Sequence, residues 1–274
     1  MTNDDEQRGM DIVREFALLS CTRNLLNQRK NEDLMSADFD LMQPPSDPHV
    51  PETAFGKWFL RTETWTVHVL ERALVDLERL MPADRHGYDV VADVGCGFGR
   101  SLGKLHQRFA PKRLIGMDID PEMLQKSAQE MAAMNIAADF ICCSSSNIKL
   151  EDDSVDLLFC HQTFHHLIDQ ERAIQEFFRV LKPGGVLLFA ESTRRYIHSW
   201  IIRLLFRHPM DVQKTAPEYL AMVRAAGFSV PDSSVSYPFL WWSREDLGIL
   251  ETALRIKPKA VREETLINLV AIKP

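Results

Sequence analysis

The sequence predicts an α/β fold in which helices cover both faces of a mostly parallel, seven-stranded sheet. From residue 89 onward, short β-rich runs alternate with helical segments of about ten to fifteen residues. Their apolar runs suit strands that are covered on both faces. The chain is also large enough for one sizeable core, since it has 274 residues, of which 45% are hydrophobic.

The first 88 residues predict a helical cap. Residues 5–29 and 58–81 carry apolar side chains at helical spacing, whereas 36–56 contain prolines that a helix cannot sustain. We therefore divide the chain into an N-terminal helical cap, residues 1–88, and a sheet domain, residues 89–274.

Seven segments of the sheet domain are expected to be strands: 89–94, 113–118, 138–143, 155–160, 186–191, about 233–240 and 265–272. The intervening helices have clear start signals. Asp120 and Asp169 are helix caps, Thr215 opens a capping box, and a further helix is expected from Ser243. Residues 194–227 form a cap-like insertion after the fifth strand.

Composition and charge exclude several classes of protein. The formal net charge of −7 offers no basic field for nucleic acid. Five cysteines without a C-x-x-C pair argue against a disulfide or zinc framework and suit a reducing cytoplasm. The N-terminus lacks the features of a signal peptide, and apolar stretches such as 200–206 are too short to span a membrane. We expect a cytoplasmic protein without a transmembrane segment; its oligomeric state is left open.

A glycine-rich turn follows the first strand and predicts a ligand site. The segment reads Asp93-Val-Gly95-Cys-Gly97-Phe-Gly99-Arg and leads into a helix. Glycines at such a turn let the backbone approach a ligand, and the helix N-terminus offers N–H donors. Asp118 ends the second strand about 20 residues later, where an acidic side chain binds ribose hydroxyls. These signals favour a nucleotide-like ligand over the alternative, a tight turn that binds nothing.

Four motifs occur in order and carry a resemblance: D-V-G-C-G-F-G, I-G-M-D-I-D-P-E-M-L, E-D-D-S-V-D-L-L-F-C with F-H-H-L, and L-K-P-G-G-V-L-L-F-A-E. Over residues 89–191 the chain resembles class I S-adenosylmethionine-dependent methyltransferases of the methyltransferase type 11 kind. The resemblance implies a Rossmann-like fold, S-adenosyl-L-methionine as cofactor and methyl transfer. Arg100 stands where a dinucleotide-binding motif has its third glycine, which argues against a nucleotide-cofactor oxidoreductase.

The resemblance also implies a set of cofactor-binding residues. Ser144 stands where the family usually places an aspartate near the adenine amino group, so this chain offers a hydroxyl there. The implied residues are Asp93, Gly95, Cys96, Gly97, Gly99, Asp118, Ile119, Ser144, Ser145 and His161.

Candidate catalytic and substrate residues follow the fourth and fifth strands, where open α/β sheets place their sites. His161 and Glu191 are candidate catalytic residues and Gln162 a candidate substrate contact. Purely structural roles are the alternative, including a salt bridge from Glu191 to Arg194 or Arg195.

The insertion begins with a segment, 194–208, that predicts one amphipathic helix. Arg195, Ser199, Arg203 and Arg207 would share one ridge, opposite apolar side chains. A plain packed helix is one interpretation; the sharper one is a lid over an apolar or anionic substrate, or a peripheral membrane contact. Under that interpretation Trp200 and Arg203 contact the substrate.

No metal is expected. Adjacent His165 and His166 should point in different directions and lack a carboxylate partner. Methyl transfer from a sulfonium is an in-line displacement that depends mainly on positioning. No N/D-P-P-Y/F tetrapeptide follows the fourth strand, so the expected acceptor is a small molecule or lipid-like compound. The alternative is a catalytically silent, cofactor-binding subunit that acts through a partner.

Overall fold

The computed structural model describes residues 45, 50, 53–83, 87–244, 254–255 and 264–274. All of them belong to one compact unit, Gln43–Pro274. The helix expected over 5–29 lies outside the described residues, as does most of the segment after Ser243. The domain boundary at residue 88 stays a prediction.

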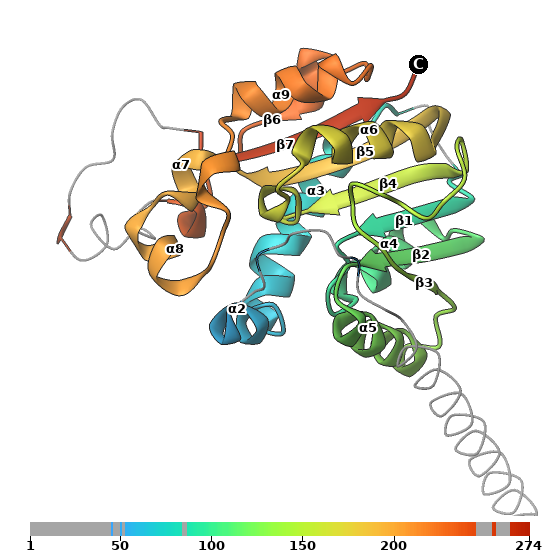
Figure 1. Cartoon of the computed structure of the whole chain (residues 1–274), viewed down its shortest axis with the longest axis horizontal. Helices are drawn as coiled ribbons and strands as arrows, with labels where there is room; N and C mark the ends of the chain where they lie inside the picture. The colour runs from blue at the N-terminus through green and yellow to red at the C-terminus, as the bar shows by residue number, and fades with distance from the viewer. Residues whose placement is uncertain (1–44, 46–49, 51–52, 84–86, 245–253, 256–263) are drawn as a thin grey trace, which may run out of the picture. The chain divides into compact units, whose positions relative to one another are not determined.

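Seven strands form one sheet in the order β3-β2-β1-β4-β5-β7-β6 (Figure 1). The first five strands are parallel, and β7 runs antiparallel to both β5 and β6. This confirms the predicted mostly parallel, Rossmann-like sheet. The bounds are Val90–Val94 for β1, Arg113–Asp118 for β2, Asp139–Cys142 for β3, Val155–His161 for β4, Leu181–Ser192 for β5, Val235–Ser236 for β6 and Leu266–Ile272 for β7.

The sixth strand is much shorter than the segment 233–240 that the sequence predicted. It pairs with β7 only through Val235 and Ser236. Pro238 follows two residues later and has no N–H to donate to a ladder, so the pairing ends there.

Two layers of helices cover the sheet. On one side α3 (Glu71–Leu80), α4 (Arg100–Phe109) and α5 (Pro121–Ala133) follow one another, and on the other lie α6 (Gln170–Val180) and α9 (Ala216–Ala225) (Figure 1). The predicted caps are present: the Asp120 side chain accepts from the Glu122 N–H, Asp169 accepts from Arg172, and Thr215 forms its capping box.

The helix predicted over 58–81 is interrupted. The chain forms α2 (Ala54–Phe59), a π-helical turn η1 (Trp65–Leu70) and then α3. Between the first two, the Thr62 hydroxyl donates to the Phe59 carbonyl at 2.7 Å and accepts from the Trp65 N–H at 3.2 Å. Such local side-chain bonds compete with helical hydrogen bonds and explain the break.

The single helix predicted over 194–208 is also wrong. Two short helices replace it, α7 (Arg194–Ile197) and α8 (Trp200–Leu205). Ser199 between them has extended backbone, as an N-cap residue does, and is buried. The predicted ridge of Arg195, Ser199, Arg203 and Arg207 is therefore not continuous. Part of the expected apolar face is exposed to solvent, since the Trp200 side chain is 64% exposed.

The core on the α6 and α9 side is rich in aromatic rings. Phe164 lies within 5.2 to 6.0 Å of three ring centroids, those of Phe177, Phe189 and Tyr219. All four side chains are fully buried. This cluster fixes the loop after β4 against the sheet, and that loop forms one wall of the site described next.

The strand order reverses between β1 and β4. From β1 the chain continues outward on one side to β2 and β3, and from β4 it continues on the other side to β5. Ligands of open α/β sheets bind at this switch point, outside the carboxyl ends of the strands. Among the described residues, no helix is both long and apolar enough to cross a lipid bilayer.

Candidate functional site

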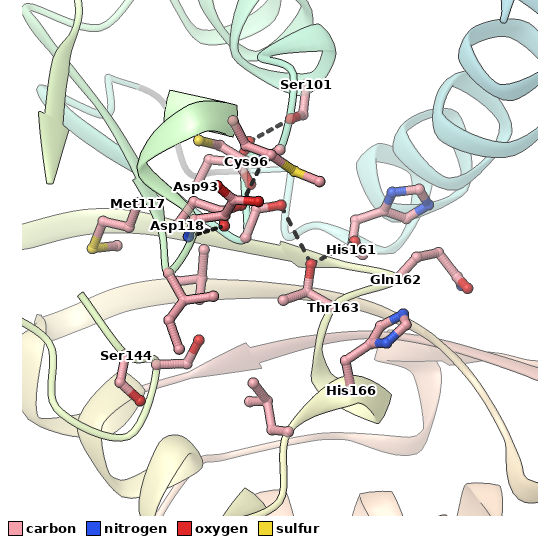
Figure 2. Close-up of a pocket in the computed structure, with 18 of the residues that line it drawn as sticks. Asp93, Cys96, Ser101, Met117, Asp118, Ser144, His161, Gln162, Thr163 and His166 are labelled. Atoms are coloured by element: carbon pink, nitrogen blue, oxygen red, sulfur yellow. Dashed lines mark hydrogen bonds between the residues drawn. The ribbon is translucent and has the colours of Figure 1, made fainter. Parts of the chain in front are cut away.

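A cavity of about 390 Å³ opens at the carboxyl ends of β1, β2 and β4 (Figure 2). Its volume falls in the usual range for small-molecule sites. Most of the predicted site residues come together here: Asp93, Gly95, Cys96, Gly97, Asp118, Ile119, Ser144, Ser145, His161 and Gln162 all line the cavity.

The glycine loop is held in a conformation that favours glycine. Gly95, Gly97 and Gly99 have φ values of +72°, +52° and +78°. The Gly95 and Cys96 N–H groups donate to the Met117 carbonyl at 2.8 and 3.0 Å, which fastens the loop to β2. A Cβ on Gly95 would lie 2.2 Å from the Thr163 side chain, so this backbone position has no room for one.

Gly99 has a different role from its neighbours. It is the N-cap of α4 and is not among the residues that line the cavity. Its Cα packs against α5, since a Cβ there would lie 2.4 Å from the Ser127 hydroxyl. The structure thus places Gly99 where the helix begins.

Asp93 lies beneath the loop and is almost fully buried. Its carboxyl group accepts a hydrogen bond from the Ser101 hydroxyl in the first turn of α4. Burial, with a smaller contribution from the charge of Asp118, raises the pKa of Asp93 to about 7. Asp93 therefore supports the loop and titrates near neutral pH.

Asp118 ends β2 and lines the cavity. One carboxylate oxygen accepts from the Gly97 N–H at 2.9 Å and the other from the Asp120 N–H at 3.0 Å. These bonds join the glycine loop to the end of β2 and fix the carboxylate in place (Figure 2). Burial raises its pKa.

Ser144 lines the cavity on the side of β3. Its hydroxyl lies 2.8 Å from the Ser146 hydroxyl and accepts from the Ser146 N–H at 3.3 Å. Together with Ser145 it gives this wall hydroxyl groups and no carboxylate.

His161 lies between two aromatic rings. Its ring is stacked on Phe159 at 5.7 Å between centroids and lies 5.4 Å from Trp65. Burial lowers its pKa to about 3, so the imidazole is neutral at physiological pH. The neighbouring Gln162 accepts from the Ser192 hydroxyl at 2.6 Å and has left-handed backbone, φ +51°.

Glu191 lies behind the cavity wall and is not among its lining residues. It is fully buried and accepts from the N–H groups of Thr163 at 2.8 Å and Phe164 at 2.7 Å. Its other oxygen lies 2.6 Å from His165 Nδ1. The structure pairs Glu191 with His165, and Arg194, one of the two suggested partners, pairs with Glu218.

Trp200 and Arg203 lie on the surface of α8, and neither lines the cavity. The helix nevertheless adjoins the helices before the sheet. The Thr53 hydroxyl donates to the Leu205 carbonyl at 3.0 Å, and Phe206 contacts the rings of Phe55 and Phe59.

Sequence reasoning missed two groups of lining residues. Leu60 and Trp65 from the helices before the sheet form part of the wall, and Lys57 lies there within 3.4 Å of Asp120. Thr163, after β4, contacts the glycine loop, because its hydroxyl donates to the Gly95 carbonyl at 3.4 Å. The aromatic-rich run 55–65 was the available signal for the first group.

The expectation for His165 and His166 is wrong in its geometry. Their ring centroids are only 4.3 Å apart, and His165 has a carboxylate partner in Glu191. His166 also lines the cavity. Burial lowers the pKa of His166.

Comparisons with known proteins relate part of this chain to methyltransferases. Residues 92–189 match the model of a family described as a methyltransferase domain. The malonyl-[acyl-carrier protein] O-methyltransferase of Marinomonas sp. (strain MWYL1) is 26% identical over 187 residues, 66% of each chain. The enzyme of the same name from Yersinia pestis is 35% identical over 106 residues, 39% of this chain and 38% of that one. The chain thus spans less than two thirds of the length of these relatives.

Solved structures share the fold. A chain of the complex between the Haloferax volcanii Trm112 methyltransferase activator and the putative methyltransferase has a TM-score of 0.59 and 22% identity, covering 80% of this chain and 96% of that one. An S-adenosylmethionine-dependent methyltransferase from Mesorhizobium loti has a TM-score of 0.54 and 18% identity, covering 76% and 99%.

Residues 92–189 therefore match a methyltransferase domain, and the chain has the fold of S-adenosylmethionine-dependent methyltransferases, for which S-adenosylmethionine is the implied cofactor. The residues present fit that group. The carboxylate of Asp118 suits a ribose diol, and Met117 and Ile119 offer apolar contacts for adenine. A Cβ on Gly97 would meet only Met123, at 3.9 Å, so the loop leaves open space on its cavity side.

Proposed function

We propose that this protein transfers the methyl group of S-adenosylmethionine to a small-molecule or lipid-like acceptor that binds in the same cavity. One observation carries the proposal. A single cavity joins the glycine loop and Asp118 to a mostly apolar wall formed by Leu60, Trp65 and Phe159. Cofactor and acceptor side by side meet the main requirement of an in-line displacement, which is alignment.

The state of His161 favours an acceptor that is already nucleophilic. An imidazole with a pKa of about 3 is too weak a base to remove a proton from an alcohol at neutral pH. A carboxylate acceptor is ionised at that pH and needs no base. The names of two relatives support this class: the malonyl-[acyl-carrier protein] O-methyltransferases and the trans-aconitate 2-methyltransferase of Deinococcus radiodurans, 32% identical over 41% of this chain. In this proposal His161 and Gln162 orient the acceptor.

Residues before the sheet and α8 complete the acceptor side in this proposal. Phe206 packs on α2, so a change in α8 reaches the wall that Leu60 and Trp65 form. Trp200→Ala and Arg203→Glu are expected to raise the acceptor KM while leaving cofactor affinity unchanged. The exposed Trp200 and Arg203 also suit an anionic membrane surface, and sedimentation with anionic vesicles separates that role from the first.

The cytoplasm is the proposed location, because the four described cysteines are buried thiols. The second candidate function is a silent subunit that binds the cofactor and acts through a partner. It is favoured by one finding, that the protein in the Haloferax volcanii complex is bound to an activator.

The test is a methyl-transfer screen with S-[methyl-³H]adenosylmethionine and two acceptor sets, carboxylic acids and neutral alcohols or amines of matched size. The proposal predicts labelled product from the acid set. Labelled product from the neutral set alone would overturn the carboxylate class. Cofactor binding without transfer to any acceptor, alone or with cell extract added, would favour the silent subunit.

A further inference from the structure

Three histidines converge beside the cavity. His165 and His166 belong to a short 3-10 turn, η2 (Phe164–His166), after β4, and His208 follows α8. The ring centroids of His165 and His208 are 5.1 Å apart, and those of His166 and His208 are 4.7 Å apart. One ring nitrogen from each of the three lies within 4.8 Å of the others.

A buried carboxylate orients one of these rings. Glu191 Oε2 lies 2.6 Å from His165 Nδ1, which leaves Nε2 as the second nitrogen of that ring. Glu191 is itself fixed, because its other oxygen accepts from the Thr163 and Phe164 N–H groups. A carboxylate on the far nitrogen of a ligating histidine is the usual outer-shell arrangement of protein metal sites.

The third histidine is held near the other two by a buried amide. Gln213 Nε2 donates to the His165 carbonyl at 2.7 Å and to the Pro209 carbonyl at 2.8 Å. The segment that carries His208 is thereby tied to the turn that carries His165. The three side chains thus come from two segments that other bonds already fix.

We propose that His165, His166 and His208 bind one divalent transition-metal ion of the zinc class, with Glu191 as the positioning residue for His165. Imidazole nitrogens suit Zn²⁺, Cu²⁺, Ni²⁺ and Fe²⁺ and not Mg²⁺ or Ca²⁺. Three side chains leave one position of a tetrahedral ion for water or a ligand oxygen, the pattern of catalytic zinc. His166 lines the cavity, so this ion lies beside the space for the acceptor.

The test uses tag-free, full-length protein stripped with dipicolinate and titrated with Zn²⁺ against a chromogenic chelator. Co²⁺ serves as the spectroscopic probe, since a tetrahedral site gives visible absorption. The variants are His208→Ala and Glu191→Gln. His198→Ala is the matched control, because His198 is exposed, lies in the same insertion and has its ring 3.3 Å from the Met210 carbonyl. None of these readouts depends on methyl transfer.

Wild type and His198→Ala are expected to bind one Zn²⁺ per chain and to give the tetrahedral cobalt spectrum. His208→Ala should bind at least about tenfold more weakly and lose that spectrum, and Glu191→Gln should weaken binding about 10- to 100-fold. Zinc at well under one per chain in the wild type, or unchanged binding by His208→Ala, would overturn the proposal. If Glu191→Gln does not fold, His208→Ala decides alone, because His208 lies in a loop and is only half-buried.

Discussion

Burial controls the protonation of single residues in this site. Asp93 and His161 are both withdrawn from solvent, and burial disfavours the charged form of each. The same cause therefore raises the pKa of the carboxyl group and lowers that of the imidazole. Burial thus favours the uncharged form of both side chains.

The first prediction follows from Asp93. Its pKa rises from 3.8 to about 7 on folding, so between these values the native state keeps a proton that the unfolded state has released. The free energy of unfolding should therefore fall as pH rises through this window and level off above about 7. Asp93→Asn should remove this part of the dependence. Urea unfolding of both proteins at about pH 5 and about pH 8 measures it; equal pH dependence of the two would contradict the account.

The second prediction concerns Ser144, which by its resemblance to the methyltransferase motifs stands where an aspartate is usual. Ser144→Asp should tighten cofactor binding if the adenine amino group lies nearby, because a carboxylate is a stronger acceptor. A tenfold gain corresponds to about 1.4 kcal/mol. Calorimetry with S-adenosylhomocysteine measures the change, and Ser145→Asp shows whether any added charge on this wall has the same effect. Equal or weaker binding by Ser144→Asp would mean that another group meets the adenine.

Between strands and helices, the turns do most of the positioning. The glycine loop is bonded to β2 through Met117 and Asp118 and packed against Thr163 after β4. Three strand ends are thereby joined at the switch point of the sheet. A change in any one of these turns should reach the cofactor.

The third prediction tests this coupling with Gly95→Ala. The new Cβ would lie 2.2 Å from the Thr163 side chain, on backbone with φ +72°. Gly87→Ala is the matched control, because Gly87 has φ +81° but nothing within 4 Å of the added Cβ. Because of the positive φ, the free energy of unfolding of both variants should fall by about 1 kcal/mol. Gly95→Ala should also bind the cofactor more weakly. Thermal melts and calorimetry compare them; equal losses in the two variants would show that the packing against Thr163 is unimportant.

For the whole molecule, the sequence predicted the sheet far better than the irregular segments. A strand occurs within or across each of the seven predicted segments, although β6 is much shorter than its segment. The central strands were the easiest to predict, because a strand buried on both faces leaves a clear hydrophobic run. The glycine loop and Asp118 could be predicted for a similar reason, since their chemistry depends on fixed local spacing.

Tertiary contacts explain what the sequence did not predict. Trp65 reaches the cavity only because helices before the sheet pack over it. His208 meets His165 and His166 only because a loop 42 positions beyond His166 folds back beside them. The helix over 194–208 was wrong because Ser199 caps a second helix, a preference that hydrophobic periodicity does not register.

The central claim is that one site, built on the glycine loop and Asp118, binds S-adenosylmethionine. Calorimetric titration with S-adenosylhomocysteine tests it most directly, on the wild type, on Asp118→Ala and on Asp139→Ala. Asp139 is the control because it is exposed at the start of β3, paired with Arg113. The account predicts one ligand per chain, unchanged binding by Asp139→Ala, and a loss of about 1 to 3 kcal/mol for Asp118→Ala. Absence of binding to the wild type, or equal affinity in wild type and Asp118→Ala, would contradict it.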